Sequence, residues 1–296
     1  MAGAPVRQAG GVRIDLHTHS SVSDGTDTPA QLLATAAAAG LDVVALTDHD
    51  TTAGWGPAEL AAPAGLTVVP GMELSCRWFP DDQPPISVHL LGYLFDPLHP
   101  AFVAERSRLR DERLSRGERI VTALAAAGYP VEWEGILQRS GGGVVGRPHI
   151  AGALVEAGVV ESVDEAFATL LNHRSPYYAT KADTDVRDGI ALVRAAGGVP
   201  VFAHGMARSR GRIVGDGAIN AMVDAGLLGL EVDHPDHTAE ERDHLRGLAA
   251  DHGLLTTGSS DYHGTNKRTP IGACTTDPAQ YEALLAAGTG SAVFTG

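Results

Sequence analysis

The 296-residue sequence contains only two cysteines, Cys76 and Cys274. Two cysteines cannot form the disulfide framework of a small secreted protein, so we expect a reducing, cytoplasmic setting. No apolar run approaches the roughly 18 residues that a membrane-spanning helix needs, which argues against a membrane partner. Residues 1–11 include Arg7 but no apolar segment, so no secretory signal is expected in them.

Aromatic residues and positive charge are also scarce. Aromatics make up 5% of the chain, so Ala, Val and Leu must fill most of the core. Acidic residues outnumber basic ones 36 to 22, which gives a formal net charge of -14. Such a charge repels long duplex nucleic acid, whereas a small phosphorylated substrate is easier to accommodate, particularly if bound divalent cations offset part of the charge.

Strand-like and helix-like runs alternate along most of the chain, as in an α/β protein. Continuous apolar strands separated by helices indicate parallel strands that are covered on both faces. About seven such units suggest a barrel of the (β/α) type, with an open doubly wound sheet as the alternative. The predicted strands are 13–17, 42–47, 66–70 leading into 72–74, 87–95, 199–203, 228–232 and 254–258, followed by a last apolar run at 291–295.

One long stretch interrupts this alternation. Residues 97–178 carry helical patterns and no convincing strand, with helices predicted at 105–127, 147–157 and 163–172. We therefore expect a barrel domain formed by 1–96 and 179–296, with a helical insertion domain at 97–178 between two of its strands.

Histidines and carboxylates follow the predicted strands. His17 and His19 lie two residues apart, so in an extended backbone both point to the same side and can bind one metal ion. Taken singly, each signal also has an ordinary structural explanation. His17 and His19 can belong to a solvated loop, His49 to a capped turn, and His89 to a hydrogen-bonded core.

The shared placement of these residues is more informative than any one of them. Each lies at the end of a predicted parallel strand or, for His89, within one, and barrel and open α/β enzymes place their sites at that edge. Imidazole and carboxylate ligands without cysteine favour Mn, Fe or Zn. The candidate metal ligands, which are also the candidate catalytic residues, are His17, His19, Asp24, His49, Glu73, His89, His204, Asp261 and His263.

Together these motifs resemble the PHP (polymerase and histidinol phosphatase) family, and specifically its stand-alone phosphoesterases that act on nucleotides. The resemblance implies a distorted (β/α)7 TIM-like barrel and a site for two or three divalent metal ions. The matching stretches are 15–20 (DLHTHS), 23–25 (SDG), 45–50 (ALTDHD), 70–73 (PGME), 88–92 (VHLLG), 203–204 (AH) and 258–264 (GSSDYHG).

The resemblance also implies a division of the ligands among three metals, with Glu73 bridging the first two and Asp48 supporting the ligands from behind. The first metal would be held by His17, His19, Glu73 and Asp261, the second by Glu73, His89 and His204, and the third by Asp24, His49 and His263. The chain departs from the family at Gly205, where the family often has proline, which bears only on the conformation of that loop.

Four further residues are candidates for binding substrate. Arg147 and His149 belong to a stretch, 146–149, that resembles a substrate-binding element of these phosphoesterases, although both could be ordinary surface residues after a helix-starting proline. Arg208 and Arg210 follow His204 and could bind phosphate, or could form a solvated basic loop.

We therefore expect a phosphoric ester hydrolase that uses a metal-activated hydroxide. Its substrates would be nucleoside monophosphates, nucleoside 3′,5′-bisphosphates or short 5′-phosphorylated RNA, and the insertion would close over them as a lid. The alternatives are a cyclic or other non-nucleotide phosphate substrate, a non-catalytic PHP module, which would be marked by lost ligands, and an amidohydrolase-type C–N hydrolase. The last would usually have a lysine where this chain has Glu73.

Overall fold

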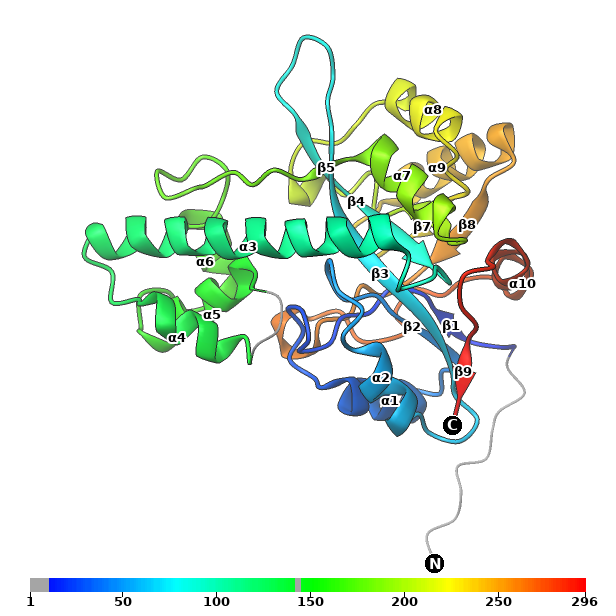
Figure 1. The fold of residues 1–296 in the computed structure, drawn as a ribbon, viewed down its shortest axis with the longest axis horizontal. Coiled ribbons are helices and arrows are strands. Elements are labelled where there is room, and N and C mark those ends of the chain that lie inside the picture. Colours follow the sequence, from blue (N-terminus) through cyan, green and yellow to red (C-terminus); the bar gives the residue numbers. More distant parts are fainter. Residues whose placement is uncertain (1–10, 142–144) are drawn as a thin grey trace, which may run out of the picture.

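The computed structural model of the protein describes residues 11–141 and 145–296. Within this part of the chain, nine strands form one sheet, in which seven strands follow one another in the order β1-β2-β3-β4-β6-β7-β8 while β5 and β9 both pair with β3 (Figure 1). The strands are β1 (Ile14–Asp15), β2 (Val43–Leu46), β3 (Thr67–Trp78), β4 (Ile86–Tyr93), β5 (Thr184–Asp185), β6 (Val199–Phe202), β7 (Gly229–Asp233), β8 (Leu255–Gly258) and β9 (Phe294–Thr295).

The two ends of the seven-strand path lie close together. Thr18, just after β1, forms a parallel bridge with Tyr262, which follows β8, and the His19 backbone N–H donates to the Tyr262 carbonyl at 2.8 Å. The Thr276 N–H donates to the Ile14 carbonyl at 2.8 Å on the other side of the same junction. The sheet therefore curls into a nearly closed barrel, which confirms the predicted α/β barrel-like fold.

The direction of β4 differs from the prediction. The chain crosses from β3 to β4 through residues 79–85 alone, and β4 runs antiparallel to both β3 and β6. A parallel connection needs a crossover of about a dozen residues or more, so this short link can only form a hairpin. His89 therefore lies inside an antiparallel strand, and it reaches the site because it pairs across the sheet with Ser75 of β3.

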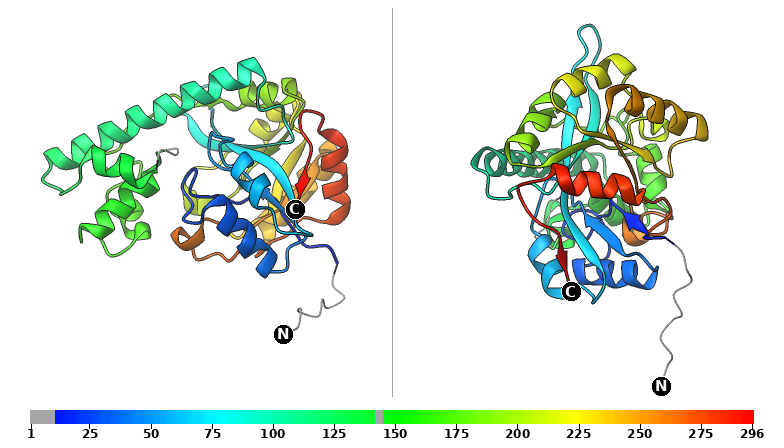
Figure 2. Two further views of the ribbon diagram at one scale, coloured as in Figure 1. Left: turned by 60° about the horizontal axis from the view of Figure 1, so that its bottom comes forward. Right: turned by 90° about the vertical axis from the view of Figure 1, so that its right-hand side faces the viewer.

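Helices cover the outside of the barrel (Figures 1 and 2). The first begins as its sequence indicates, with Thr28 accepting a hydrogen bond from the Gln31 N–H and Pro29 in the first helical position. Inside the barrel, side chains such as Leu16, Val69 and Val201 pack with Tyr281 and other residues of the C-terminal helix. The barrel helices are α1 (Pro29–Ala38), α2 (Trp55–Ala61), α7 (Val186–Ala195), α8 (Asp216–Asp224), α9 (Ala239–His252) and α10 (Pro278–Ala287).

Four more helices lie between β4 and β5 and gather beside the barrel (Figure 2). The first of them, α3, is 27 residues long and joins two cores. Phe102 and Leu109 pack into the core formed by the sheet and its covering helices, whereas Ile120 and Leu124 belong to a second core made with the other three helices. The four are α3 (Pro100–Ala126), α4 (Trp133–Arg139), α5 (Arg147–Glu156) and α6 (Val163–Thr169).

None of the helices in residues 11–141 and 145–296 combines the length and the apolar character that crossing a membrane requires.

Candidate metal centre

The backbone after β1 turns two histidines toward the inside of the barrel. The Thr18 hydroxyl donates to the Ala45 carbonyl at 2.6 Å, and the Thr18 N–H donates to the Thr47 hydroxyl at 3.1 Å. These bonds hold the segment in register with β2, so that the residues on either side of Thr18 face the opposite way. The Nε2 atoms of His17 and His19 consequently lie only 3.0 Å apart, and both side chains are buried.

Glu73, on β3, lies at the centre of the cluster. Its carboxylate is buried, and each of its oxygens faces imidazole nitrogens at 2.5 to 3.2 Å. Burial would raise the pKa of the Glu73 carboxyl, but the surrounding imidazoles hold that pKa well below its ordinary value. The histidines around this carboxylate are His17, His19, His49, His89 and His204.

The cluster contains three groups of side chains with the composition of a metal site. In each group, one ligand atom from every member lies within 4.8 Å of the ligand atoms of all the others. Shared members, such as His19, His49 and Glu73, link the groups into one assembly. The first group is His17, His19, Glu73 and Asp261, the second is His19, Asp24, His49 and His263, and the third is His49, Glu73 and His89.

These groups resemble the implied ligand sets with two differences. The second group contains His19 in addition to Asp24, His49 and His263, and the third contains His49 where the resemblance implies His204. His204 is nevertheless close, since its Nε2 lies 2.9 Å from Glu73 Oε1. The structure thus brings all nine candidate ligands together at the same end of the barrel.

The chemistry of the cluster fits divalent cations. Nine side chains converge on a small buried volume, and all of them are imidazoles or carboxylates. Two of the facing atoms, His49 Nδ1 and Asp261 Oδ1, are buried and make no hydrogen bond, although a carboxylate faces the first at 3.2 Å and imidazoles face the second. Since a buried polar atom without a hydrogen bond costs about 1–3 kcal/mol, these atoms are suited to coordinate ions.

A further layer of carboxylates orients the ligands from behind. Glu231, on β7, lies 3.0 Å from His17 Nδ1 and accepts the His204 backbone N–H at 2.7 Å. A carboxylate in this position fixes the tautomer and the direction of a ligating imidazole. Asp48 belongs to none of the three groups and accepts both the N–H and the hydroxyl of Ser20, at 2.8 and 2.7 Å.

Three residues of this region adopt a left-handed backbone that favours glycine. The φ angles are 54° at Asp50, 32° at His204 and 51° at Asp261. For residues with a side chain such conformations cost roughly 1–3 kcal/mol each and persist only where surrounding contacts impose them. Their concentration around the cluster indicates that the loops are held in place for the sake of the side chains they present.

An ion pair that the sequence did not reveal ties α3 to the metal cluster. Arg113 Nε donates to Asp50 Oδ2 at 2.5 Å, and Arg113 Nη2 donates to the Ser75 hydroxyl at 2.7 Å. Asp50 also accepts the Ser75 N–H at 2.6 Å. Because Asp50 follows His49 directly, this contact links the long helix to one of the candidate ligands. Nothing in the sequence distinguishes Arg113 from the other arginines of α3.

Two more arginines lie near Arg113, around the start of α5. Arg116 donates to the Ala179 carbonyl and Arg147 donates to the Leu171 carbonyl, both at 2.9 Å. Among the described residues neither arginine forms an ion pair, and burial together with the nearby Arg147 lowers the pKa of Arg116 to about 9. These guanidinium groups, which we call the arginine cluster (Arg113, Arg116 and Arg147), line a small cavity between α3 and α5.

The other candidates for substrate binding occupy different places. His149 Nδ1 accepts the Gly146 N–H at 3.1 Å, so this residue caps the start of α5. Arg210 donates to Asp261 at 2.6 Å and therefore reaches the metal cluster. Arg208 instead pairs with Glu241 at 3.0 Å, on the opposite side of the same turn.

Lys267 also donates to Asp261 Oδ2 at 2.6 Å. Burial would raise the pKa of the Asp261 carboxyl, but Lys267 and Arg210 lower it well below its ordinary value. Two cations therefore lie beside the metal cluster, on the side of β8 and the turn after β6.

Comparison with known proteins supports the same interpretation. The PHP domain family matches residues 15–129. A 3′,5′-nucleoside bisphosphate phosphatase from Chromobacterium violaceum is 33% identical over 84% of this chain and 87% of its own length. A phosphoribosyl 1,2-cyclic phosphate 1,2-diphosphodiesterase from Eggerthella lenta is 33% identical over 86% of this chain and 96% of its own length.

A solved structure from Bifidobacterium adolescentis, assigned to the metal-dependent phosphoesterases, superimposes with a TM-score of 0.88. It is 37% identical to this chain and covers 95% of it and 98% of its own length. The fold, the convergence of histidines and carboxylates at one end of the barrel, and these similarities lead to one conclusion: the chain belongs to the PHP family of metal-dependent phosphoesterases.

Proposed function

We propose that the nine-residue cluster holds two or three divalent ions, of Mn, Fe or Zn, and that the chain uses them to hydrolyse phosphate esters of small nucleotides. The observation that carries this proposal is the environment of Glu73, a buried carboxylate surrounded by five imidazoles. The first two groups would each hold an ion. Glu73 and His89 would hold another, together with either His204 or His49.

The ions would supply Lewis acidity, which polarises phosphoryl oxygens and lowers the pKa of water. The residues of the chain have separate tasks. Glu231 holds His17 in the orientation that ligation needs. Arg210 and Lys267 place positive charge beside Asp261, where they can stabilise charge that develops on the phosphoryl group.

The arginine cluster supports a substrate with more than one phosphate. It brings three guanidinium groups together, and Asp50 is the one carboxylate paired with them in the described part of the chain. A buried guanidinium group without a negatively charged partner is costly, and a bound phosphate would supply that negative charge. We therefore place the phosphate that is not hydrolysed against Arg147 and Arg116, as a nucleoside 3′,5′-bisphosphate or a short 5′-phosphorylated RNA would present it.

We propose that residues 97–178 act as a substrate-covering domain, with 1–96 and 179–296 as the catalytic barrel. The direct contact between Arg113 and Asp50 supports this division of labour, because it places the helical part against the metal cluster. A cytoplasmic location remains our proposal, supported by the two free cysteines, Cys76 and Cys274.

A cyclic phosphate ester is the second candidate substrate, because the Eggerthella lenta relative, which acts on one, is as similar to this chain as the bisphosphate phosphatase is. A non-catalytic module is not favoured, since all nine candidate ligands are present and convergent. A C–N hydrolase is not favoured either, because the centre of the cluster is occupied by the glutamate Glu73 and the relatives named above act on phosphate esters.

The test is hydrolysis by Mn-supplemented protein of four substrates: AMP, 3′,5′-bisphosphoadenosine, a 5′-phosphorylated oligoribonucleotide and 5-phosphoribosyl 1,2-cyclic phosphate. The products are separated by chromatography, because the first two substrates would release inorganic phosphate, the RNA would release nucleoside monophosphates, and the cyclic ester would first open to a phosphomonoester. A double variant, Asp24→Ala with His49→Ala, is the control. Hydrolysis that the control lacks, with 3′,5′-bisphosphoadenosine preferred over AMP, is the expected result. Metal-loaded protein that hydrolyses none of the four would refute the proposal.

A further inference from the structure

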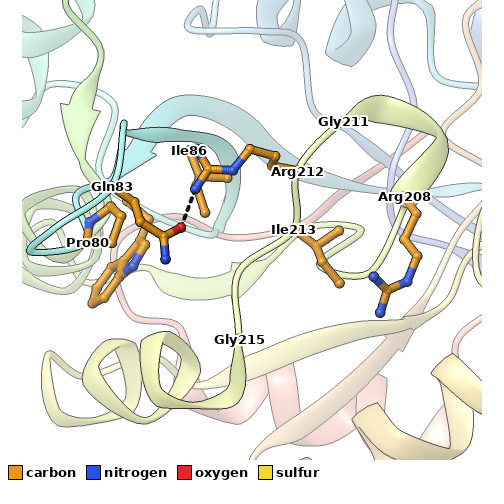
Figure 3. A pocket seen from close by; sticks show the side chains of 9 residues that line it. Pro80, Gln83, Ile86, Arg208, Gly211, Arg212, Ile213 and Gly215 are labelled. Atoms are coloured by element: carbon orange, nitrogen blue, oxygen red, sulfur yellow. Dashed lines mark hydrogen bonds between the residues drawn. The ribbon is translucent and has the colours of Figure 1, made fainter.

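A groove of about 440 Å³ lies between two loops at the same end of the barrel as the metal cluster. Figure 3 shows its two walls. One wall is the tip of the β3–β4 hairpin, and the other is the loop between β6 and α8. The volume is in the range of small-ligand sites, roughly 300–1,000 Å³. The lining residues that matter here are Trp78, Gln83, Ile86, Arg208, Arg212 and Ile213.

The groove combines an aromatic ring with free positive charge. Trp78 is half-buried, and the guanidinium of Arg187 lies 5.3 Å from the centre of its ring. Arg212 extends across the groove and donates to Gln83 Oε1 at 2.8 Å (Figure 3). It also donates to the Pro84 carbonyl at 3.0 Å. In the part of the chain that the structure describes, Arg212 forms no ion pair, so its charge is available to an anion.

One short turn lies between the groove and the metal cluster. Arg208 and Arg210 are the first and last residues of the 3-10 turn η1 (Arg208–Arg210). Arg210 points to Asp261 in the metal cluster, while Arg208 lines the groove, with 65% of its side chain exposed. A chain of linked phosphates could therefore pass from one side of this turn to the other.

We propose that this groove binds the nucleotides of a single-stranded RNA substrate that lie beyond the one being hydrolysed. The proposal rests on the proposed function. Single-stranded nucleic acid is bound elsewhere by aromatic side chains that stack with bases and by basic residues that follow the backbone. Trp78, with Ile86 and Ile213, offers the apolar surface for a base, and Arg212 offers the charge for an adjoining phosphate.

The test compares two ligands on protein from which metal has been removed by a chelator, so that neither is consumed. One is a 5′-phosphorylated ribotetranucleotide with a 3′ fluorophore, followed by fluorescence anisotropy. The other is 3′,5′-bisphosphoadenosine, measured as a competitor. The variants are Trp78→Leu, Trp78→Phe and Arg212→Gln. Arg246→Gln is the matched control, because it removes one exposed positive charge from α9, away from the groove lining.

We expect Trp78→Leu to weaken tetranucleotide binding about fivefold or more, as loss of one stacked base predicts, and Trp78→Phe to restore most of it. Arg212→Gln should lower the slope of log affinity against log salt by about 0.7, the value for one phosphate contact on a single strand. The affinity of the Trp78 and Arg212 variants for 3′,5′-bisphosphoadenosine should stay within about twofold of wild type. The affinity of Arg246→Gln for both ligands should also stay within about twofold of wild type.

The groove would be ruled out if the tetranucleotide failed to bind wild-type protein, if Trp78→Leu left its affinity unchanged, or if both ligands weakened equally. Hydrolysis of 3′,5′-bisphosphoadenosine by the Mn-loaded wild type is measured alongside. Normal hydrolysis combined with any of those results would refute only the proposal that the groove binds RNA. Absence of hydrolysis would count against the proposed function itself.

Discussion

Substitution of Glu73 and of Asp24 should remove different numbers of metal ions. Glu73 belongs to two of the three ligand groups, whereas Asp24 belongs to one. Glu73→Gln should therefore lose two ions and keep the one bound by His19, Asp24, His49 and His263. Asp24→Asn should lose only that ion. Metal content measured by inductively coupled plasma analysis after Mn loading should fall by two equivalents in the first variant and by one in the second.

The same difference should appear in thermal stability. An ion present at about 1,000 times its dissociation constant stabilises the folded state by about 4 kcal/mol. With an unfolding entropy of about 2.1 cal/mol/K per residue, a chain of 296 residues unfolds with about 0.6 kcal/mol/K, so each ion should raise Tm by about 7 °C. Glu73→Gln should thus lose about twice as much of the Mn-induced rise in Tm as Asp24→Asn loses.

The chelated proteins serve as the control, because the substitutions also change the metal-free cluster. The comparison is therefore the Mn-induced rise in Tm of each variant, measured against its own chelated form. Equal metal content in the two variants, or an Mn-induced rise in Glu73→Gln as large as in wild type, would contradict the placement of Glu73 between two metal sites.

Three further perturbations test other parts of the structure. Arg147→Met should raise KM for 3′,5′-bisphosphoadenosine about tenfold with unchanged metal content, as loss of one charged hydrogen bond of about 1.5–3 kcal/mol predicts; an unchanged KM would remove Arg147 from the phosphate site. Asp50→Asn should cost about 3–5 kcal/mol in the free energy of unfolding measured with urea at pH 7 on chelated protein, because Arg113 is left buried without its partner. Burial would raise the pKa of Asp50, but Arg113 holds that pKa below its ordinary value, so the ion pair stabilises the folded protein fully above the pKa of the unfolded carboxyl, near 4. The difference in unfolding free energy between wild type and variant should therefore shrink as the pH falls to about 3, and a constant difference would contradict the ion pair. Gly264→Ala should lower Mn content by one equivalent. Gly264 has a φ of 65° and an added Cβ would meet the Thr26 hydroxyl, so the loop would distort next to the ligand His263. Retention of full metal content would show that this loop tolerates the change.

The positions of most strands, and of the ligands at their ends, could be predicted from the sequence. Strands buried on both faces appear as continuous apolar runs, and β2, β6 and β8 lie within a residue or two of their predicted ranges. Helix starts also carry local signals in the sequence, since the Thr28 hydroxyl caps α1 and the Ser162 hydroxyl caps α6. These features depend on neighbours in the sequence, which is why the sequence alone reveals them.

The antiparallel direction of β4 was not predicted, because the apolar run of residues 87–95 looks the same in a parallel and in an antiparallel strand. The length of the link before it, residues 79–85, does carry this information. The short helices α2 and α4 were not identified. Seven residues give too few turns for a periodic pattern, and neither helix begins with a side-chain cap such as the one Ser162 provides for α6, which has the same length. The arginine cluster was not anticipated as a whole either. Which arginines of a long, charged helix turn inward depends on packing between residues more than sixty positions apart, as the Arg113–Asp50 pair shows.

The most direct test of metal-dependent phosphate ester hydrolysis is a reconstitution experiment. Protein stripped with a chelator would be loaded stepwise with Mn, and phosphate release from 3′,5′-bisphosphoadenosine would be measured at each bound equivalent. We predict no activity in the stripped protein and a rise that reaches its maximum only when two or three equivalents are bound. Full activity in the stripped protein, or none in protein shown to carry its full metal complement, would contradict the account.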